Sequence, residues 1–459
     1  MSRGATVFLL AAAILLSALV GGSVLMRTLG AAAKPVGSAL FAFDPDDIRS
    51  VKIQNGDASF ELKKTDNGWQ ISPLPRDRAS SEAIKELVQT ALSTLVLDRI
   101  LSREIADKDR LSEFGVRKSQ LQLDFRGDKD LSLIFGKDTV DETRGYVRFE
   151  NSEDVYVISN KLSRMIQRPV GDFRDRRLAS VHPARVDRMV IKRPGGEMEL
   201  RRDGQGWKIV KPLSARADAA FVSSFLEKLL RSGVEGFVAE EGGDPGTYGL
   251  SEPAAEVQLF GEGDKDPQII RLGSAAREGG VYARLIPRNV ICRLPDSVSK
   301  QLALDLASFR DLALARINLD MVDLIRITAG SSRVVLKRAP DGWELDDGSK
   351  RTAVAADAVP RMVQALAQAK TVRFEPATIG ALQKAGLESP ALSVSFLSVV
   401  SENTPESPAG EQAVIRLDFG TVRQNGLVGV HAEGSPEIFF VSEKVLEAIP
   451  ANPAGWNPS

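Results

Sequence analysis

Apolar and polar side chains alternate along much of the chain, and the alternation comes in blocks that end at turn residues. Residues 51–53 and 60–63 alternate in this way, which is typical of half-buried strands. Asp66-Asn67-Gly68 follows, and it predicts a tight turn because Asn and Gly tolerate positive φ. Trp69 then begins a returning strand. The block therefore predicts a hairpin with a tryptophan at the start of its second strand.

A helical spacing replaces the alternation after Pro73 and Pro75. Ser80 or Ser81 can cap a helix that carries one apolar stripe. The stripe consists of Ala83, Ile84, Leu87, Val88, Ala91 and Leu95. Similar stripes follow at Phe221, Val222, Phe225, Leu226 and Leu229, with Asp218 as cap, and at Val359, Met362, Val363 and Leu366, with Pro360 in the first turn.

Four further alternating segments follow a short helical turn that ends near Gly115. Short polar turns join them, so an antiparallel meander is the simplest topology. The segments are 121–125, 131–136, 146–149 and 155–158, and a closing helix is expected near 160–167. We therefore predict an α+β unit: a mostly antiparallel sheet of about seven short strands with two or three flanking helices.

This unit occurs three times. The pattern L-[KR]-[KR]-x-x-x-G-W ends at Trp69, Trp207 and Trp343, at intervals of 138 and 136 residues. Other landmarks keep nearly the same period, namely Gly115, Gly249 and Gly386, and Phe135-Gly136, Leu272-Gly273 and Phe419-Gly420. The last interval is longer because residues 401–410 read as an inserted polar loop. Units of this size are large enough for each to form its own hydrophobic core. We therefore expect three tandem domains, at 41–178, 179–314 and 315–450, followed by a C-terminal tail at 451–459.

The start of the chain differs from the repeats. The 22 residues from Ala5 to Met26 carry no charge, and as a helix they would span about 33 Å, enough for a hydrocarbon core of about 30 Å. The apolar part of a signal peptide is usually shorter, about 7–15 residues. We predict that residues 1–36 form an uncleaved transmembrane anchor; cleavage near Ala31-Ala32-Ala33 is the alternative. Basic residues lie on both sides, so the orientation stays open.

Composition narrows the chemistry. Lys and Arg number 60 against 61 Asp and Glu, which argues against a nucleic-acid-binding protein. The single cysteine, Cys292, excludes an intrachain disulfide and a multi-cysteine metal site. His182 and His431 are the only histidines, and no G-x-S-x-G motif surrounds a serine. We therefore expect no enzymatic activity, cofactor or metal, although a hydrolase that uses one of the histidines is a third hypothesis.

Two repeated motifs supply the candidate interaction residues. Trp69, Trp207 and Trp343 each follow a basic pair and could bind an anionic glycan or a lipid headgroup. The favoured interpretation is that each tryptophan covers the sheet while alternate Lys and Arg side chains face water, with some cation–π contact.

The second motif is Phe173-Arg174-Asp175, which returns as Phe309-Arg310-Asp311 where one unit passes into the next. It could be a docking motif. We favour a structural role in which the phenylalanine fills a junction between domains and the arginine pairs with an aspartate or a nearby carbonyl.

The order of these motifs resembles a known family. One membrane helix, the repeated G-W hairpin, a capped helix, a Gly-Leu or Gly-Val turn, an [FL]-G strand end and the F-R-D junction together resemble the bacterial family of domains of unknown function numbered four thousand three hundred and forty. The third copy departs from the pattern because it has no F-R-D close. The resemblance implies a membrane-anchored, envelope-facing protein that accompanies ABC-type transport systems, including gliding-motility-type ones, and it implies no enzymatic activity.

We therefore expect a single-pass inner-membrane protein with its bulk in the periplasm, acting as a non-enzymatic scaffold or accessory subunit of an ABC-type complex. Permease, ATPase or auxiliary subunits are the expected partners. The alternative is a module that binds envelope glycan or lipid in the clefts between domains.

Overall fold

A computed structural model describes residues 33–456, except residues 74, 105–109, 118, 129, 205, 240–242 and 401–409. The predicted membrane helix and most of the predicted polar loop lie outside the described residues. Among the helices that are described, none has the length and apolar character needed to cross a membrane.

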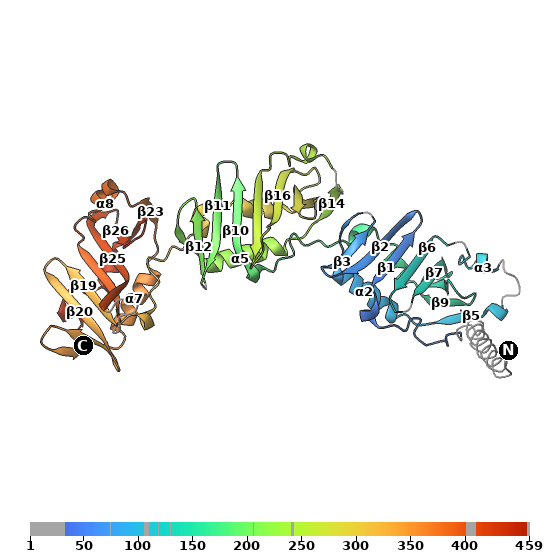
Figure 1. Ribbon diagram of the computed structural model, residues 1–459, viewed down its shortest axis with the longest axis horizontal. Helices are drawn as coiled ribbons and strands as arrows, with labels where there is room; N and C mark the ends of the chain where they lie inside the picture. Colours follow the sequence, from blue (N-terminus) through green and yellow to red (C-terminus); the bar gives the residue numbers. More distant parts are fainter. Residues whose placement is uncertain are drawn as a thin grey trace, which may run out of the picture. The chain divides into compact units, whose positions relative to one another are not determined.

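Three nine-stranded antiparallel sheets form the body of the protein, one for each repeat (Figure 1). The first sheet has the order β4-β3-β2-β1-β6-β7-β8-β9-β5. Its strands are β1 (Ser50–Asn55), β2 (Ala58–Thr65), β3 (Gly68–Ser72), β4 (Asp77–Arg78), β5 (Asp98–Ile100), β6 (Leu121–Arg126), β7 (Leu131–Asp138), β8 (Arg144–Phe149) and β9 (Val155–Ser159).

The second and third sheets repeat this order, as β13-β12-β11-β10-β15-β16-β17-β18-β14 and β22-β21-β20-β19-β24-β25-β26-β27-β23. The second contains β10 (Val186–Arg193), β11 (Gly196–Asp203), β12 (Gly206–Lys211), β13 (Ala215–Ala217), β14 (Gly236–Ala239), β15 (Ala255–Gly261), β16 (Gln268–Ala275), β17 (Val281–Ile286) and β18 (Val290–Leu294). The third contains β19 (Leu324–Ala329), β20 (Ser332–Ala339), β21 (Gly342–Asp346), β22 (Arg351–Ala353), β23 (Arg373–Pro376), β24 (Leu392–Val400), β25 (Gly410–Gln424), β26 (Leu427–Ala432) and β27 (Glu437–Ser442).

The α+β class, the hairpin and the meander are confirmed, but the estimate of about seven strands was too low. The two additional strands, such as β4 and β5, form the two edges of the sheet. They contain two and three residues, so they are too short to show alternation. The long helix connects one edge to the other, since it follows β4 and precedes β5.

The long helix of each repeat is α2 (Ser81–Leu92), α5 (Ala219–Arg231) or α7 (Ala358–Gln368). Ser80 caps the first, because its side chain accepts a hydrogen bond from the backbone N–H of Ala83, and Asp218 does the same for Phe221. The predicted stripe of α2 is buried except at its ends: Ala83 is half-buried, and Leu95 lies beyond the helix and is 47% exposed. In α7, Val363 is likewise only half-buried.

Each repeat also contains shorter helices. They are α3 (Arg110–Glu113), α4 (Lys161–Ile166), α6 (Asp296–Leu302) and α8 (Ile379–Ala385), with 3-10 turns at η3 (Val170–Phe173), η5 (Pro245–Tyr248), η6 (Leu306–Phe309), η8 (Glu443–Ala448) and η9 (Pro453–Trp456). Phe173 ends η3, Phe309 ends η6 and Trp456 ends η9, and all three side chains are buried. The third repeat therefore closes with a tryptophan where the others have the phenylalanine of F-R-D, and residues 451–456 fold with that repeat.

In each repeat, a glycine at the end of a helical turn and a glycine in a strand lie in close contact. Gly249 stops η5 in the left-handed conformation, with φ of 67°. The strand glycine Gly273 lies against the carbonyl oxygen of Tyr248, so that a Cβ at Gly273 would collide with it. The same pairing joins Gly115 to Gly136 and Gly386 to Gly420.

The chain forms two compact units. The first comprises Met1–Glu197 and Ser224–Leu304, and the second comprises Met198–Ser223 and Asp305–Ser459. Each unit contains one F-R-D segment together with the residues that surround it.

Candidate functional site

Each F-R-D segment begins with a phenylalanine in a hydrophobic core. Phe173 is 1% exposed and packs against Phe60, with ring centroids 5.5 Å apart. Phe309 is fully buried and meets Phe221 edge-on at 5.1 Å. These contacts fix the point at which the chain leaves one repeat.

The following residues connect two repeats through backbone bridges. In the first unit, Arg174 bridges Ala79 beside β4, and Arg177 bridges Gly233 before β14. We call this connection, with the side chains that contact it, the first junction. In the second unit, Arg310 bridges Ala217 and Ala313 bridges Lys370, and this is the second junction.

The first junction contains a buried three-membered ion cluster. Asp77 accepts hydrogen bonds from Nε of Arg174 at 2.9 Å and from Nε and Nη2 of Arg288 at 2.8 and 2.7 Å. The three side chains are 0–6% exposed. Arg288, from the β17–β18 turn, also donates to the backbone carbonyls of Asp175 and Arg177 at 2.7 and 2.9 Å. The Arg174 guanidinium lies 3.7 Å from the ring centre of Phe237.

The second junction balances its charges differently. Arg310 donates from Nη2 to the carboxylate of Glu437, and its guanidinium lies 3.4 Å from the ring centre of Phe374. Phe374 corresponds to Phe237, because each pairs from the edge strand with the last strand of its repeat. The carboxylate that neutralises the arginine thus comes from β27 here and from β4 in the first junction.

The two motif aspartates are each paired with nearby arginines. Asp311 accepts hydrogen bonds from Arg316 Nε at 2.6 Å and from the backbone N–H of Ala313 at 3.0 Å. Burial acts to raise the pKa of Asp311, but these hydrogen bonds and the charge of Arg216 outweigh it and hold the pKa below its usual value. The pKa of Asp175 is lowered in the same way by Arg177 and Arg78 against the effect of burial.

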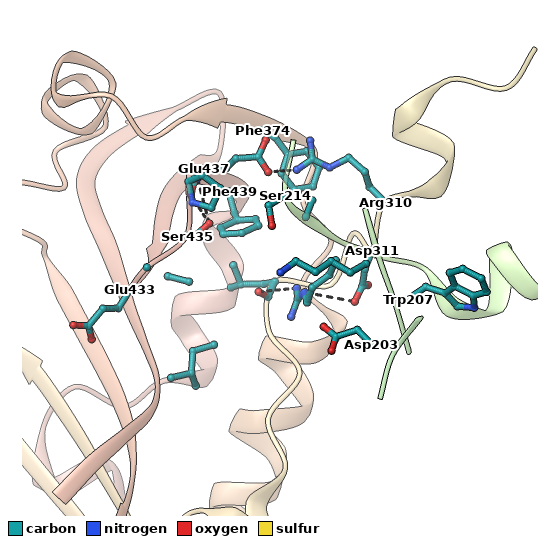
Figure 2. A pocket seen from close by; sticks show the side chains of 18 residues that line it. Asp203, Trp207, Ser214, Arg310, Asp311, Phe374, Glu433, Ser435, Glu437 and Phe439 are labelled. Carbon is teal, nitrogen blue, oxygen red and sulfur yellow. Dashed lines mark hydrogen bonds and ion pairs between the residues drawn. The ribbon is translucent and has the colours of Figure 1, made fainter. Parts of the chain in front are cut away.

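A pocket of about 360 Å³ lies at the second junction (Figure 2). Its buried part includes Trp207, Leu314, Arg310, Asp311 and Glu437. Figure 2 shows Arg310 and Glu437 joined beside Phe374 on one side of the pocket and Asp311 on the other. The structure thus places three of the predicted residues, Trp207, Arg310 and Asp311, around one cavity. Arg174 and Asp175 lie at the first junction.

The tryptophans lie where each hairpin returns. Trp207 and Trp343 are 3% and 8% exposed, and they stack with Arg202 and Arg338, whose guanidinium groups lie 4.7 and 5.1 Å from the ring centres. The register explains this contact, since each tryptophan pairs directly with the second basic residue of its motif. Trp69 is only half-buried and pairs with Lys64.

The two histidines and the cysteine have ordinary surroundings. His182 accepts a hydrogen bond from the backbone N–H of Ala184 through Nδ1, and His431 Nε2 lies 3.0 Å from the carbonyl oxygen of Ser435. Burial raises the pKa of Cys292 to about 12, so its thiol is protonated at neutral pH. In the described part of the chain, no group of three or more His, Cys, Asp or Glu side chains is arranged to hold a metal ion.

Sequence reasoning missed the partners of the motif arginines. Phe237 and Phe374 are 137 residues apart and could have been found from the period. Asp77 and Arg288 have no counterparts of the same type in the other repeats, so the periodicity gives no signal for them. Glu437 corresponds to Val290 in the second repeat, so the comparison of the two junctions gives no signal for it either.

The chain matches the family described as Domain of unknown function (DUF4340) twice, at residues 92–253 and 207–356. Neither match coincides with one repeat. Each begins inside one repeat, contains one F-R-D segment and ends inside the next. No curated protein matches the chain. Since the two matches together cover more than half of its length, the chain belongs to this family of domains of unknown function.

Proposed function

We propose that the protein is a non-enzymatic scaffold, or accessory subunit, of an ABC-type transport complex, held at the inner membrane by its N-terminal segment with its bulk in the periplasm. The observation that carries this proposal is the construction of the junctions. Buried ion pairs and backbone bridges bind successive repeats together, as a protein that presents fixed surfaces to partners requires.

The start of the first repeat supports a tether. Ala39 bridges Leu95 just as Arg177 bridges Gly233 and Ala313 bridges Lys370. Arg99 donates to the backbone carbonyls of Ala33 and Lys34 at 3.4 and 3.2 Å, and Phe41 is buried in the first core. The residues that follow the uncharged segment are therefore fixed to the first repeat, which suits a tether that holds this domain close to a membrane.

The association with ABC-type systems rests on the family resemblance. Its test is affinity purification of the full chain from membranes in mild detergent after crosslinking, with quantitative mass spectrometry. We expect enrichment of ABC permease and ATPase subunits over an unrelated single-pass membrane protein. Equal recovery from both baits would contradict the proposal.

The second candidate, a module that binds envelope glycan or lipid between domains, is favoured by the pocket at the second junction, which joins aromatic side chains to charged groups of both signs. The decisive comparison is Trp207→Phe against wild type for binding to isolated envelope glycan and to vesicles of anionic lipid. Specific loss of binding with unchanged thermal stability would favour this candidate over the scaffold.

A further inference from the structure

The two junctions can be compared position by position, because the strand registers align them. Ile71 pairs with Asp77 in the first repeat and Ile209 pairs with Ala215 in the second, so Ala215 holds the position of Asp77. Phe237 pairs with Cys292 and Phe374 pairs with Phe439, so Cys292 and Phe439 hold equivalent positions. Arg288 precedes Cys292 by the same number of residues as Ser435 precedes Phe439, so Ser435 is the counterpart of Arg288. The buried Asp77–Arg288 bridge of the first junction is thus replaced by alanine and serine at the second.

This replacement explains the pocket. Ala215 and Ser435 both line it, so the space that the Arg288 guanidinium fills at the first junction is a cavity at the second. The pocket therefore occupies the position that the Arg288 side chain fills at the first junction.

The charges at the second junction show what is missing. The first junction combines two carboxylates, Asp77 and Asp175, with the guanidinium groups of Arg78, Arg174, Arg177 and Arg288. The second combines two carboxylates, Asp311 and Glu437, with only Arg216, Arg310 and Arg316. Within the part of the chain that the structure describes, the second junction thus has one guanidinium group fewer than the first.

The local contacts agree with this comparison. The Asp77 carboxylate binds two arginines, whereas, of the arginines that the structure describes, that of Glu437 binds one, Arg310. At the rim, the carboxylates of Asp203 and Glu433 and the ammonium of Lys208 have no ion-pair partner among the described residues, which adds a net negative charge. Completing the second junction on the pattern of the first therefore requires a cation that donates to Glu437, as Arg288 donates to Asp77.

We propose that the second-junction pocket binds an arginine side chain of a partner polypeptide. A guanidinium in this position donates to the Glu437 carboxylate and lies near the Phe374 ring, as Arg288 donates to Asp77 and lies 6.0 Å from the Phe237 ring centre. The occupant is a polypeptide because a protein side chain fills the equivalent space within this chain. The inference rests on the proposed scaffold function, for which it supplies the chemistry of one partner contact.

The test is calorimetric titration of the full chain, in detergent, with the peptide acetyl-Gly-Arg-Gly-amide. We expect saturable binding at one site, and at least about tenfold weaker binding of the citrulline peptide, which has the same shape without the charge. Methylguanidine alone should also bind more weakly. Equal affinity for the arginine and citrulline peptides, tighter binding of a glutamate peptide, equal binding of methylguanidine, or no saturable binding of the arginine peptide would each overturn the proposal.

Substitutions locate the site. Ser435→Arg supplies the missing side chain from within the chain and should abolish binding. Ser152→Arg is the matched control, because Ser152 lies in the corresponding β8–β9 turn of the first repeat, and it should bind the peptide like wild type. Glu437→Gln should weaken binding roughly tenfold. Equal binding by the Ser435→Arg and Ser152→Arg variants would contradict the assignment, and so would undiminished binding by Glu437→Gln.

These outcomes are separable from those of the scaffold proposal. Peptide binding does not depend on an ABC-type partner, and crosslinking to permease subunits does not depend on this pocket. Failure of the titration with successful crosslinking would remove only the present inference.

Discussion

At the scale of single residues, the junctions depend on charges that are paired out of contact with water. Asp77 is fully buried between Arg174 and Arg288. Loss of one member of such a cluster leaves buried charge without compensation, which costs far more than the loss of an exposed ion pair.

This difference gives a direct prediction. Asp77→Asn should lower the free energy of unfolding of the first unit by about 3 to 5 kcal/mol, because two buried arginines lose their carboxylate. Asp128→Asn removes an exposed pair with Arg49 and should change stability by less than about 1 kcal/mol. Scanning calorimetry of both variants measures the effect, and equal melting temperatures would contradict the account of the cluster.

The motif aspartates predict a pH dependence. The folded-state pKa of Asp311 lies below its unfolded value, so this group contributes stability above the unfolded pKa of about 4 and loses it as the pH falls through the folded value. Asp311→Asn should therefore be less stable than wild type at pH 7, and the difference should shrink below about pH 4. Urea unfolding at several pH values tests this. A difference that is constant with pH, or grows in acid, would show that the carboxylate charge is not what stabilises the junction.

At the scale of elements, the repeated glycines are steric requirements. Gly273→Ala places a Cβ against the carbonyl oxygen of Tyr248, where neither backbone segment can move freely. We expect destabilisation by about 1 to 3 kcal/mol or more. Gly171→Ala is the control, since nothing lies within 4 Å of its added Cβ and its φ is not positive. If thermal melts show that the two variants lose equal stability, the close contact between the glycines has no energetic role.

Much of each element could be predicted from periodicity alone. The hairpin, the long helix with its Ser80 or Asp218 cap, and the meander all leave patterns of several residues. The edge strands β4 and β5 do not, because pairing with a neighbour, and not their own alternation, makes them strands. Asp77 lies on such an edge strand and Arg288 in a turn, which is why the ion cluster escaped prediction.

At the scale of the whole molecule, the three copies of the repeat allow equivalent junctions to be compared within one chain. The same linker, with the same phenylalanine, arginine and aspartate, is completed by an Asp–Arg bridge at one junction and left with a pocket at the other. Under the proposed scaffold function, one junction is closed by its own side chains and the other is available to a side chain of a partner.

The second junction lacks the arginine that fills the first, so removal of that arginine should change the number of peptide sites per chain. Arg288→Ser should open an equivalent site beside Asp77, so titration with acetyl-Gly-Arg-Gly-amide should give two sites per chain where wild type gives one. Circular dichroism would confirm that the variant is folded. A folded Arg288→Ser variant that binds no more peptide than wild type would contradict the account.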